Sequence, residues 1–503
     1  LFGPNARLSI GGSVIASTAE RVIFDDGVSF GGSDTTSNPL LTVSTPIGLQ
    51  LGATAGPIEV QGTPANNFFF RAPTLSIAPN QTLALIGGQI DINSASISAP
   101  DSRVEIWAMQ NGTVQIPPSG NWQLASLSAL PTWGNITLRE SSSIDTSGAN
   151  GGAVNIRGRG LTLQDGSSIT SFTGANGQGQ GINVQTSQFV DLLGVSHPEN
   201  YIPPGLTTGV FGSEAVAGDI TIHTQQLRLA NAGWIQSMNF GTDFFTFAPI
   251  TEAKTGNIVI RATDVEVGGH LPFPNPATGV YVASAITTLV SGGQQNDSGT
   301  ISVEAQRVRL VDGGRISTDL VGAPNFFTGL TDFTTGNAGD ISVTATESLE
   351  IRGTTPDNFS SAIISSIQNF ADGQAGDIEI RAGQLTLSDG GTISSAISGS
   401  PIAANAGKGT AGNITIRATD VQVSDPIIDL YSQGFTGITV AIGQNSTVVV
   451  EQNPTDQRGN IDLRANSVRV FNGGQITSSS EGNGPAGNVN LTASTIDVQG
   501  RSQ

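Results

Sequence analysis

The chain has 503 residues, with 65 glycines, no cysteine, and 40 Asp plus Glu against 21 Lys plus Arg, a formal net charge of −19. This acidic balance excludes nucleic acid as an expected partner, because phosphate binding needs a basic patch. The lack of cysteine excludes disulfides and thiolate sites. The sequence has no run of about 18 apolar residues, which is the length that a membrane-spanning helix needs.

Three segments follow one another along the chain. Residues 1–116 differ in sequence from the rest and begin at Leu1 without an initiator Met, so we expect a fragment of a longer protein. Residues 117–133, which contain Pro117, Pro118 and Trp122, break the pattern, and we expect an irregular connection there. Residues 134–503 are predicted to form a repeat region.

The repeat region is marked by a recurring Gly-Asx-Ile-x-Ile signature, first clear at Gly218-Asp219-Ile220-Thr221-Ile222. The other copies begin at Gly256, Gly299, Gly339, Gly376, Gly412, Gly459 and Gly487, with weaker copies at Gly134, Gly152 and Gly181. A motif that recurs at the spacing between these glycines is typical of solenoid architectures, in which each unit buries its apolar residues by stacking on its neighbours.

One unit, residues 376–394, shows how such a repeat could fold. It reads GDIEIRAGQLTLSDGGTIS, with apolar residues alternating with polar ones in two runs and a last one after an Asp-Gly-Gly turn. Period two places the alternating residues on one face. We expect the following to point inward: Ile378, Ile380, Leu385, Leu387 and Ile393.

This pattern predicts an all-β protein, a single-stranded right-handed parallel β-helix with three short strands per rung. Frequent glycine and the lack of a 3.6-residue period argue against helices. The repeat is longer than three short strands require, and we expect the excess, such as residues 321–338 and 396–411, to form loops projecting from one flank. Two rungs per repeat are the alternative.

No cluster of residues suggests catalysis, a metal or a cofactor. The Asx residues of the signature could bind Ca²⁺, but stacking as a ladder that caps the turns is the favoured interpretation. Turn residues Asp165, Asp312 and Asp389 could supply paired carboxylates, yet no Lys or Arg recurs beside them. The only histidines, His197, His223 and His270, lack metal-ligand spacing. We therefore expect no enzyme, no metal and no cofactor.

Aromatic residues offer the candidate binding surface. Many phenylalanines fall in the two long segments that follow a third strand, namely Phe240, Phe244, Phe245 and Phe247, then Phe326, Phe327 and Phe333. They could form an exposed face for carbohydrate or a partner protein. The alternative, which is more usual for loop aromatics, is that they fold back and cover the flank of the rod.

Several runs carry a family resemblance. The N-terminal stretches LFGPNARLSIGGSVIAS and LSIAPNQTLALIGG, and the later AGNITIRATDVQV and LTLSDGGTIS, resemble filamentous-haemagglutinin-type two-partner-secretion exoproteins, especially the cyanobacterial branch. By this resemblance, residues 1–116 are the C-terminal part of the secretion domain and residues 134–503 the β-helix passenger.

The resemblance implies export by a partner outer-membrane transporter and a secreted or cell-surface location. The family's Asn-Pro-Asn-Gly-type motif lies upstream of Leu1, so this fragment alone is not expected to be transported. The expected function is an adhesin-like stalk, whose ligands could be glycans or cell surfaces. The alternatives are a polysaccharide-active β-helix enzyme and the stalk of a haemolysin or contact-dependent toxin.

Overall fold

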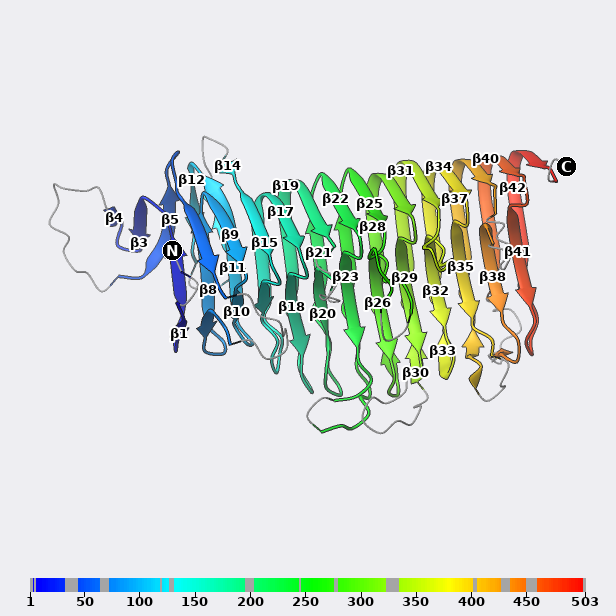
Figure 1. The fold of residues 1–503 in the computed structure, drawn as a ribbon, viewed down its shortest axis with the longest axis horizontal. Coiled ribbons are helices and arrows are strands. Elements are labelled where there is room, and N and C mark those ends of the chain that lie inside the picture. Colours follow the sequence, from blue (N-terminus) through cyan, green and yellow to red (C-terminus); the bar gives the residue numbers. More distant parts are fainter. Residues whose placement is uncertain are drawn as a thin grey trace.

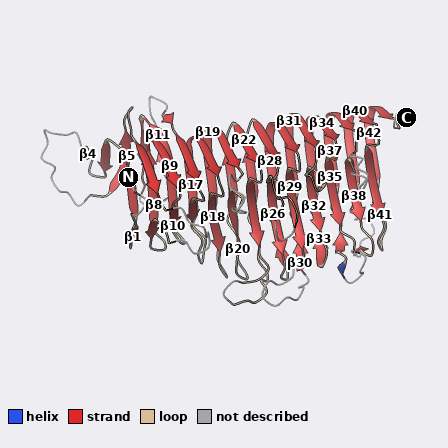
Figure 2. Ribbon diagram, viewed as in Figure 1, coloured by secondary structure: helices blue, strands red, loops and turns tan. Residues whose placement is uncertain are grey.

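The fold is seen in a computed structural model that describes residues 3, 6–31, 44–63, 72–117, 120–125, 131–194, 203–243, 246–275, 279–322, 334–400, 405–426, 435–448 and 459–500. None of these residues lies in an α-helix. Strands make up most of the ribbon (Figure 2). None of the described segments is therefore an apolar helix of membrane-spanning length.

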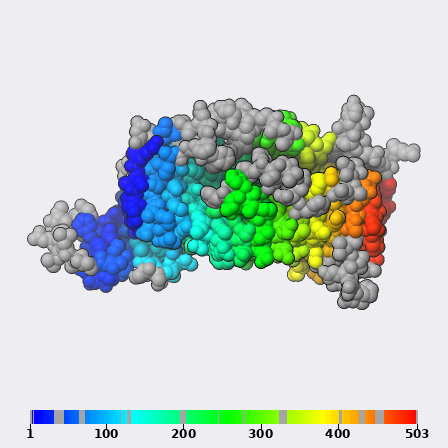
Figure 3. Space-filling view, turned by 90° about the horizontal axis from the view of Figure 1, so that it is seen from below, coloured from blue at the N-terminus to red at the C-terminus, as the bar shows by residue number. Residues whose placement is uncertain are grey.

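The strands wind into one elongated parallel β-helix. The colours in Figures 1 and 3 run in chain order from one end of the rod to the other, because each rung stacks on the one before it. Two large sheets, of 19 and 13 strands, form the walls, and their strands are parallel apart from the short β14 (Thr132–Trp133), which pairs antiparallel with β11 (Arg103–Gln110). The expected all-β parallel β-helix is confirmed.

The 13-stranded sheet holds the third strand of each rung. Its strands are β1 (Leu8–Ile10), β7 (Leu75–Ile77), β10 (Ser96–Ser98), β16 (Ser143–Asp145), β18 (Ser168–Thr173), β20 (Gly205–Val210), β23 (Trp234–Asn239), β26 (Ala285–Ser291), β29 (Arg315–Val321), β32 (Ala362–Ile367), β35 (Thr392–Ile397), β38 (Gly437–Ile442) and β41 (Gln475–Ser480).

The 19-stranded sheet holds the first and second strands. It contains β2 (Val14–Ser17), β6 (Pro57–Gln61), β8 (Thr82–Gly87), β9 (Gln89–Asn93), β11 (Arg103–Gln110), β14 (Thr132–Trp133), β15 (Asn135–Arg139), β17 (Ala153–Gln164), β19 (Gly181–Leu193), β21 (Ile220–His223), β22 (Gln226–Ala230), β24 (Ile258–Arg261), β25 (Asp264–Gly268), β28 (Ile301–Val311), β31 (Ile341–Arg352), β34 (Ile378–Ser388), β37 (Ile414–Val423), β40 (Ile461–Val470) and β42 (Val489–Val498). In most rungs the two expected strands are joined into one. Some of these joined strands have a register shift in the middle, as at Ala305/Arg307.

Each repeat supplies one rung. Val303 of β28 pairs with Val343 of β31, and Val343 pairs with Ile380 of β34, so successive copies of the signature stack directly. The alternative of two rungs per repeat is therefore wrong. The five residues expected to point inward are each at most 1% exposed, which confirms the predicted register: Ile378, Ile380, Leu385, Leu387 and Ile393.

The corner after the second strand is built as the sequence predicted. Asp165, Asp312, Asp389 and Asn472 all have positive φ angles, between 48° and 55°. Asp and Asn tolerate this left-handed conformation better than other residues with a side chain. The Asx-Gly pairs therefore turn the chain from the second strand into the third.

The signature glycines form a column that leaves no room for a side chain. A Cβ atom on Gly376 would lie 2.0 Å from the carbonyl oxygen of Gly339, one rung earlier. The third strand explains this close approach, because a buried hydroxyl there bonds to the glycine backbone. The Gly376 N–H donates to Ser365 Oγ at 2.7 Å, and Thr318 Oγ1 donates to the Gly339 carbonyl at 2.6 Å.

The weak copy of the signature at Gly134 does not begin a rung, contrary to the prediction from the sequence. Its strand, β15, pairs with β9 and with the second half of β17, so it is a second strand and not the start of a rung. The first strand of that rung is β11, which pairs with β8 and with the first half of β17. Gly134 instead stacks on Gly88, whose carbonyl oxygen would lie 1.8 Å from an added Cβ atom.

The segments expected to be projecting loops are partly strand. Ala396 lies in β35, and the ends of the two segments form β30 (Thr334–Asn337) and β36 (Lys408–Thr410). These belong to a fourth, five-stranded column with β27 (Asn296–Asp297), β33 (Ala371–Gln374) and β39 (Thr447–Val448). The column forms because parallel rungs bring equivalent backbone groups side by side. Residues 323–333 and 401–404 lie outside the described residues.

A second, smaller core lies outside the β-helix at its N-terminal end. An antiparallel sheet of β13 (Gln123–Leu124), β12 (Gly112–Gln115), β5 (Pro46–Leu51), β3 (Arg21–Phe24) and β4 (Ser29–Gly31) adjoins β8 and β11. The apolar outer side chains Ile86, Trp107 and Met109 are buried there, together with Trp122. The segment expected as an irregular connection, 117–133, thus contributes β13, β14 and the buried Trp122.

Candidate functional site

Parallel stacking arranges the outward side chains in columns along the rod. The residue directly after the second apolar position of each signature forms one such column. Arg157 of β17 pairs with Gln185 of β19, Gln185 with His223 of β21, and His223 with Arg261 of β24. Four residues far apart in sequence therefore lie on consecutive rungs, about 4.8 Å apart.

A groove of about 620 Å³ follows this column. Its lining comes from four rungs and from the short strands β13 and β14, which supply Leu124 and Trp133. The remaining lining residues are Arg157, Gly158, Gln185, Thr186, Ser187, His223, Thr224, Gln225, Arg261 and Ala262. None of these is Asp or Glu, although the chain as a whole carries a net charge of −19. The groove is thus a locally basic and polar site on an acidic protein.

Tryptophan and arginine form the N-terminal end of the groove. The Arg157 guanidinium lies over the Trp107 ring, 4.5 Å from its centroid, and the Trp133 ring lies 6.5 Å from that of Trp107. Partial burial lowers the pKa of Arg157, while the nearby Glu105 carboxylate raises it. The described residues give Arg157 no ion pair or hydrogen bond, so its N–H groups are available for a ligand.

Glu105 lies beneath this end and is 1% exposed. It accepts hydrogen bonds from Trp107 Nε1 at 2.8 Å, Arg103 Nε at 2.5 Å and Asn155 Nδ2 at 3.0 Å. Burial raises the pKa of the Glu105 carboxyl, although these donors act in the opposite direction. These hydrogen bonds hold the Trp107 side chain in place and link the neighbouring strands.

Hydroxyl and amide groups line the middle of the groove. Thr186 Oγ1 donates to Thr224 Oγ1 at 2.8 Å and so links two rungs. Gln185, Gln225 and His223 are exposed. Within the part of the chain that the structure describes, their side chains make no hydrogen bond. These groups can donate to and accept from a polar ligand.

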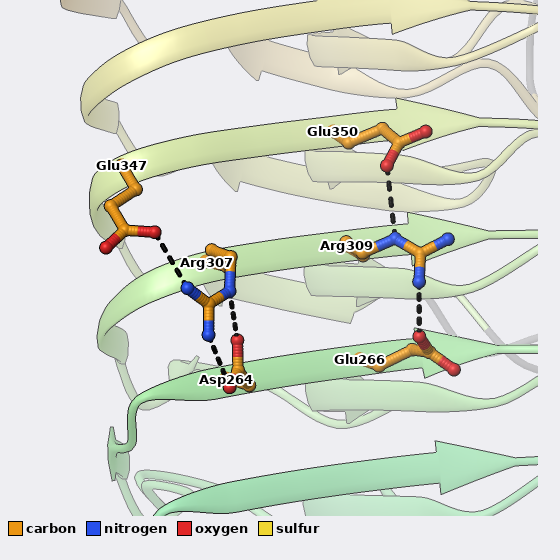
Figure 4. A network of polar contacts seen from close by, with 6 residues as sticks. All are labelled: Asp264, Glu266, Arg307, Arg309, Glu347 and Glu350. Atoms are coloured by element: carbon orange, nitrogen blue, oxygen red, sulfur yellow. Dashed lines mark hydrogen bonds and ion pairs between the residues drawn. The ribbon is translucent and has the colours of Figure 1, made fainter.

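Further along the rod, charged residues neutralise one another instead. Arg307 bonds to Asp264 and Glu347, and Arg309 bonds to Glu266 and Glu350, so each arginine of β28 bridges the rungs on either side (Figure 4). The hydrogen bonds that Arg307 donates to Asp264 and Glu347 raise the pKa of its guanidinium. This network leaves little free charge for a ligand, and exposed pairs of this kind contribute only modestly to stability.

A second polar cluster lies on the outer face of the third strands. Ser366 Oγ donates to Asp319 Oδ1 at 2.5 Å, and burial raises the pKa of this carboxyl. Burial also lowers the pKa of Arg315, which lies 4.9 Å over the Phe359 ring and donates to the Ser360 carbonyl. The donors to Asp319 come from the protein's own strands, so these hydrogen bonds connect neighbouring rungs.

The predicted aromatic surface is only partly visible. Phe240 is half-buried, and its ring lies 5.5 Å from that of Phe172 of β18. Phe247 is 50% exposed. The remaining five candidates lie outside the described residues: Phe244, Phe245, Phe326, Phe327 and Phe333. The binding role of these phenylalanines remains a prediction.

The other candidate groups are dispersed. Asp312 and Asp389 do not occupy adjacent rungs, since Gly353 takes the equivalent corner between them. His223 lines the groove, His270 stacks edge-on against Tyr281, and His197 lies outside the described residues. No group of three or more His, Asp or Glu in the described ranges could hold a metal ion.

The Asx residues of the signature form the predicted ladder. Their side-chain oxygens accept backbone N–H groups from the next rung, at 2.7 Å from Asn257 to Asp219 and at 2.7 Å from Asp377 to Asp340. The same bond recurs at Asn413, Asn460 and Asn488. These oxygens are thus engaged in linking rungs, as the stacking interpretation requires.

The comparison with known families concerns the N-terminal third. Residues 1–156 match the family model of the TPS secretion domain. This match supports a two-partner-secretion exoprotein that is exported through a partner transporter. The boundary expected at residue 116 stays a prediction. No curated protein and no solved structure matched the chain.

Proposed function

We propose that this chain, a two-partner-secretion exoprotein by its N-terminal TPS secretion domain, is an adhesin-like stalk at the cell surface. The observation that carries the proposal is the continuity of the rod. The secretion domain and the repeats share the same two large sheets, so the rungs after residue 156 extend directly from those matched by the family model. Such a rod can hold a binding surface away from the membrane.

The lateral surface suits attachment better than it suits catalysis. Among the described residues the carboxylates on the rod bond mainly to arginines or backbone N–H groups. The aspartates of the Asp-Gly corners, Asp312 and Asp389, do not lie on adjacent rungs. A polysaccharide-active enzyme would need several Asp and a basic residue converging on one groove, and the lining of the groove along Arg157 and His223 includes no carboxylate. A non-enzymatic role is therefore the favoured function.

The test compares attachment of bacteria that carry the full reading frame with attachment of a strain from which it is deleted. Deletion should lower attachment to glycan-coated and cellular surfaces, and purified residues 1–503 should compete with the intact strain. Unchanged attachment after deletion would contradict the stalk. Release of sugar products by the purified protein, abolished by Asp312→Asn or Asp389→Asn, would favour the polysaccharide-active enzyme instead.

A further inference from the structure

We infer that the groove between Trp133 and Arg261 binds an acidic, carboxylate-bearing oligosaccharide laid along the rod axis. The inference rests on the proposed adhesive function and names its ligand class. Three features of the groove carry it, namely its charge, its aromatic end and its repeat along the axis.

The first feature is a set of basic side chains that a ligand can reach. Arg157 has no ion-pair partner among the described residues, His223 offers an exposed imidazole, and Arg261 is held by the Glu304 carboxylate at 3.0 Å. Both members of that pair are about half exposed, at 52% and 54%, so a ligand can exchange for Glu304 at little expense. The planar guanidinium of Arg157 can bind a carboxylate through two parallel N–H donors.

The second feature is the combination of an aromatic wall with neutral polar groups. Trp133 presents a ring at the entrance, and Trp107 supports Arg157 from below. Gln185, Ser187 and Gln225 then offer amides and a hydroxyl along the floor. Sugar rings present an apolar face and a rim of hydroxyls, and such surfaces meet an aromatic ring and amide groups well.

The third feature is spacing. Arg157 and His223 lie two rungs apart and Arg261 lies one rung beyond, so the basic groups recur at multiples of about 4.8 Å. This repeat is of the same order as one pyranose unit, so carboxylates on successive sugars can meet successive rungs. The basic groups can therefore meet the first, third and fourth of four successive sugars, with the neutral Gln185 at the second, whereas a nucleic acid would need a denser basic surface.

The test is a calorimetric titration of residues 1–503 with an oligogalacturonide of about four sugars, which matches the length of a groove of four rungs. Its methyl-esterified counterpart, which has the same rings without the charge, is the ligand control. Binding of the acidic form and loss of binding on esterification are expected. Equal affinity for both forms, or no binding of either, would overturn the inference.

Variants locate the site. Arg157→Gln and His223→Gln should each weaken binding, with about tenfold or more lost for Arg157→Gln. The matched control is Arg381→Gln, because Arg381 stands in the same outward column but is paired with Glu379. His223 is exposed, so its replacement tests the groove even if Arg157→Gln lowers the melting temperature.

The outcomes separate the groove from the wider proposal. Unchanged affinity in both groove variants, or full displacement by equimolar inorganic phosphate, would overturn the groove as an oligosaccharide site. Attachment that disappears on deleting the reading frame would still support the stalk in that case. Attachment that survives the deletion would contradict the stalk whatever the titration shows.

Discussion

The Oδ1 atom of Asp377 accepts the backbone N–H of Asn413 at 2.8 Å, across the boundary between two rungs. The same bond recurs one rung later, where Asn413 Oδ1 accepts the backbone N–H of Asn460 at 3.1 Å. A side-chain carbonyl or carboxylate at this position therefore adds a bond between rungs beside the ordinary sheet ladder. The step after Thr300 differs: in the described residues its hydroxyl makes no such bond to Asp340.

The ladder predicts that the acceptor oxygen matters and that the negative charge does not. Asp377→Ala should lower the free energy of unfolding by about 0.5–1.5 kcal/mol, because it removes one acceptor from a half-buried N–H. Asp377→Asn keeps Oδ1 and should behave like the parent in urea unfolding. A fall as large for Asn as for Ala, or a rise in melting temperature with Ca²⁺ that the Asn variant loses, would instead indicate a cation site.

The glycine column predicts a steric penalty. Gly376→Ala would place a Cβ atom 2.0 Å from the Gly339 carbonyl oxygen, so β31 and β34 should separate locally at a cost of about 1–3 kcal/mol or more. Amide hydrogen exchange in these two strands measures the change directly. Gly12→Ala is the control, since nothing lies within 4 Å of that position. Equal protection in the two variants would show that the column tolerates side chains.

Glu105 predicts a dependence of stability on pH. Its folded-state pKa is raised above the ordinary value of 4.5, chiefly by burial, so the folded chain binds this proton more tightly than the unfolded chain does. Its contribution to stability is therefore greatest below pH of about 4.5 and falls as pH rises through the folded-state pKa. Relative to Glu105→Gln, the parent should lose unfolding free energy over that window. A relative gain with rising pH would refute the assignment.

The two phenylalanines in the described part of the first aromatic segment should differ. Phe240→Ser should lower the melting temperature, because the Phe240 ring packs 5.5 Å from that of Phe172. Phe247→Ser, at a half-exposed position, should leave melting nearly unchanged and weaken attachment to glycan or cell surfaces. If Phe247→Ser lowers the melting temperature and leaves attachment of the folded fraction unaltered, the aromatic side chains only cover the flank of the rod.

Local patterns in the sequence were enough to predict the rungs. Alternation set which side chains of residues 376–394 point inward, and Asx-Gly pairs set the corner, because both depend on the backbone of a few neighbouring residues. The buried hydroxyl of Ser365 was missed, although a signal was present. An Ile-x-Ser or Ile-x-Thr run recurs in the third strands, and its polar member faces inward to meet the signature glycine.

The remaining features depend on contacts between distant segments. Trp122 is buried because β12 and β13 return to cover Trp107, a pairing that no local pattern specifies. The groove residues Arg157 and His223 come from different repeats, and only the register brings them into one column. Reading the position after the second apolar residue of each signature would have found them, once each copy is taken as one rung.

Export is the most direct test of the account. The full reading frame is expressed in a Gram-negative host with and without its cognate outer-membrane partner, and surface protein is measured by protease accessibility of whole cells. The account predicts accessible, strand-rich protein only when the partner is present. Equal surface protein without the partner would contradict a two-partner-secretion exoprotein.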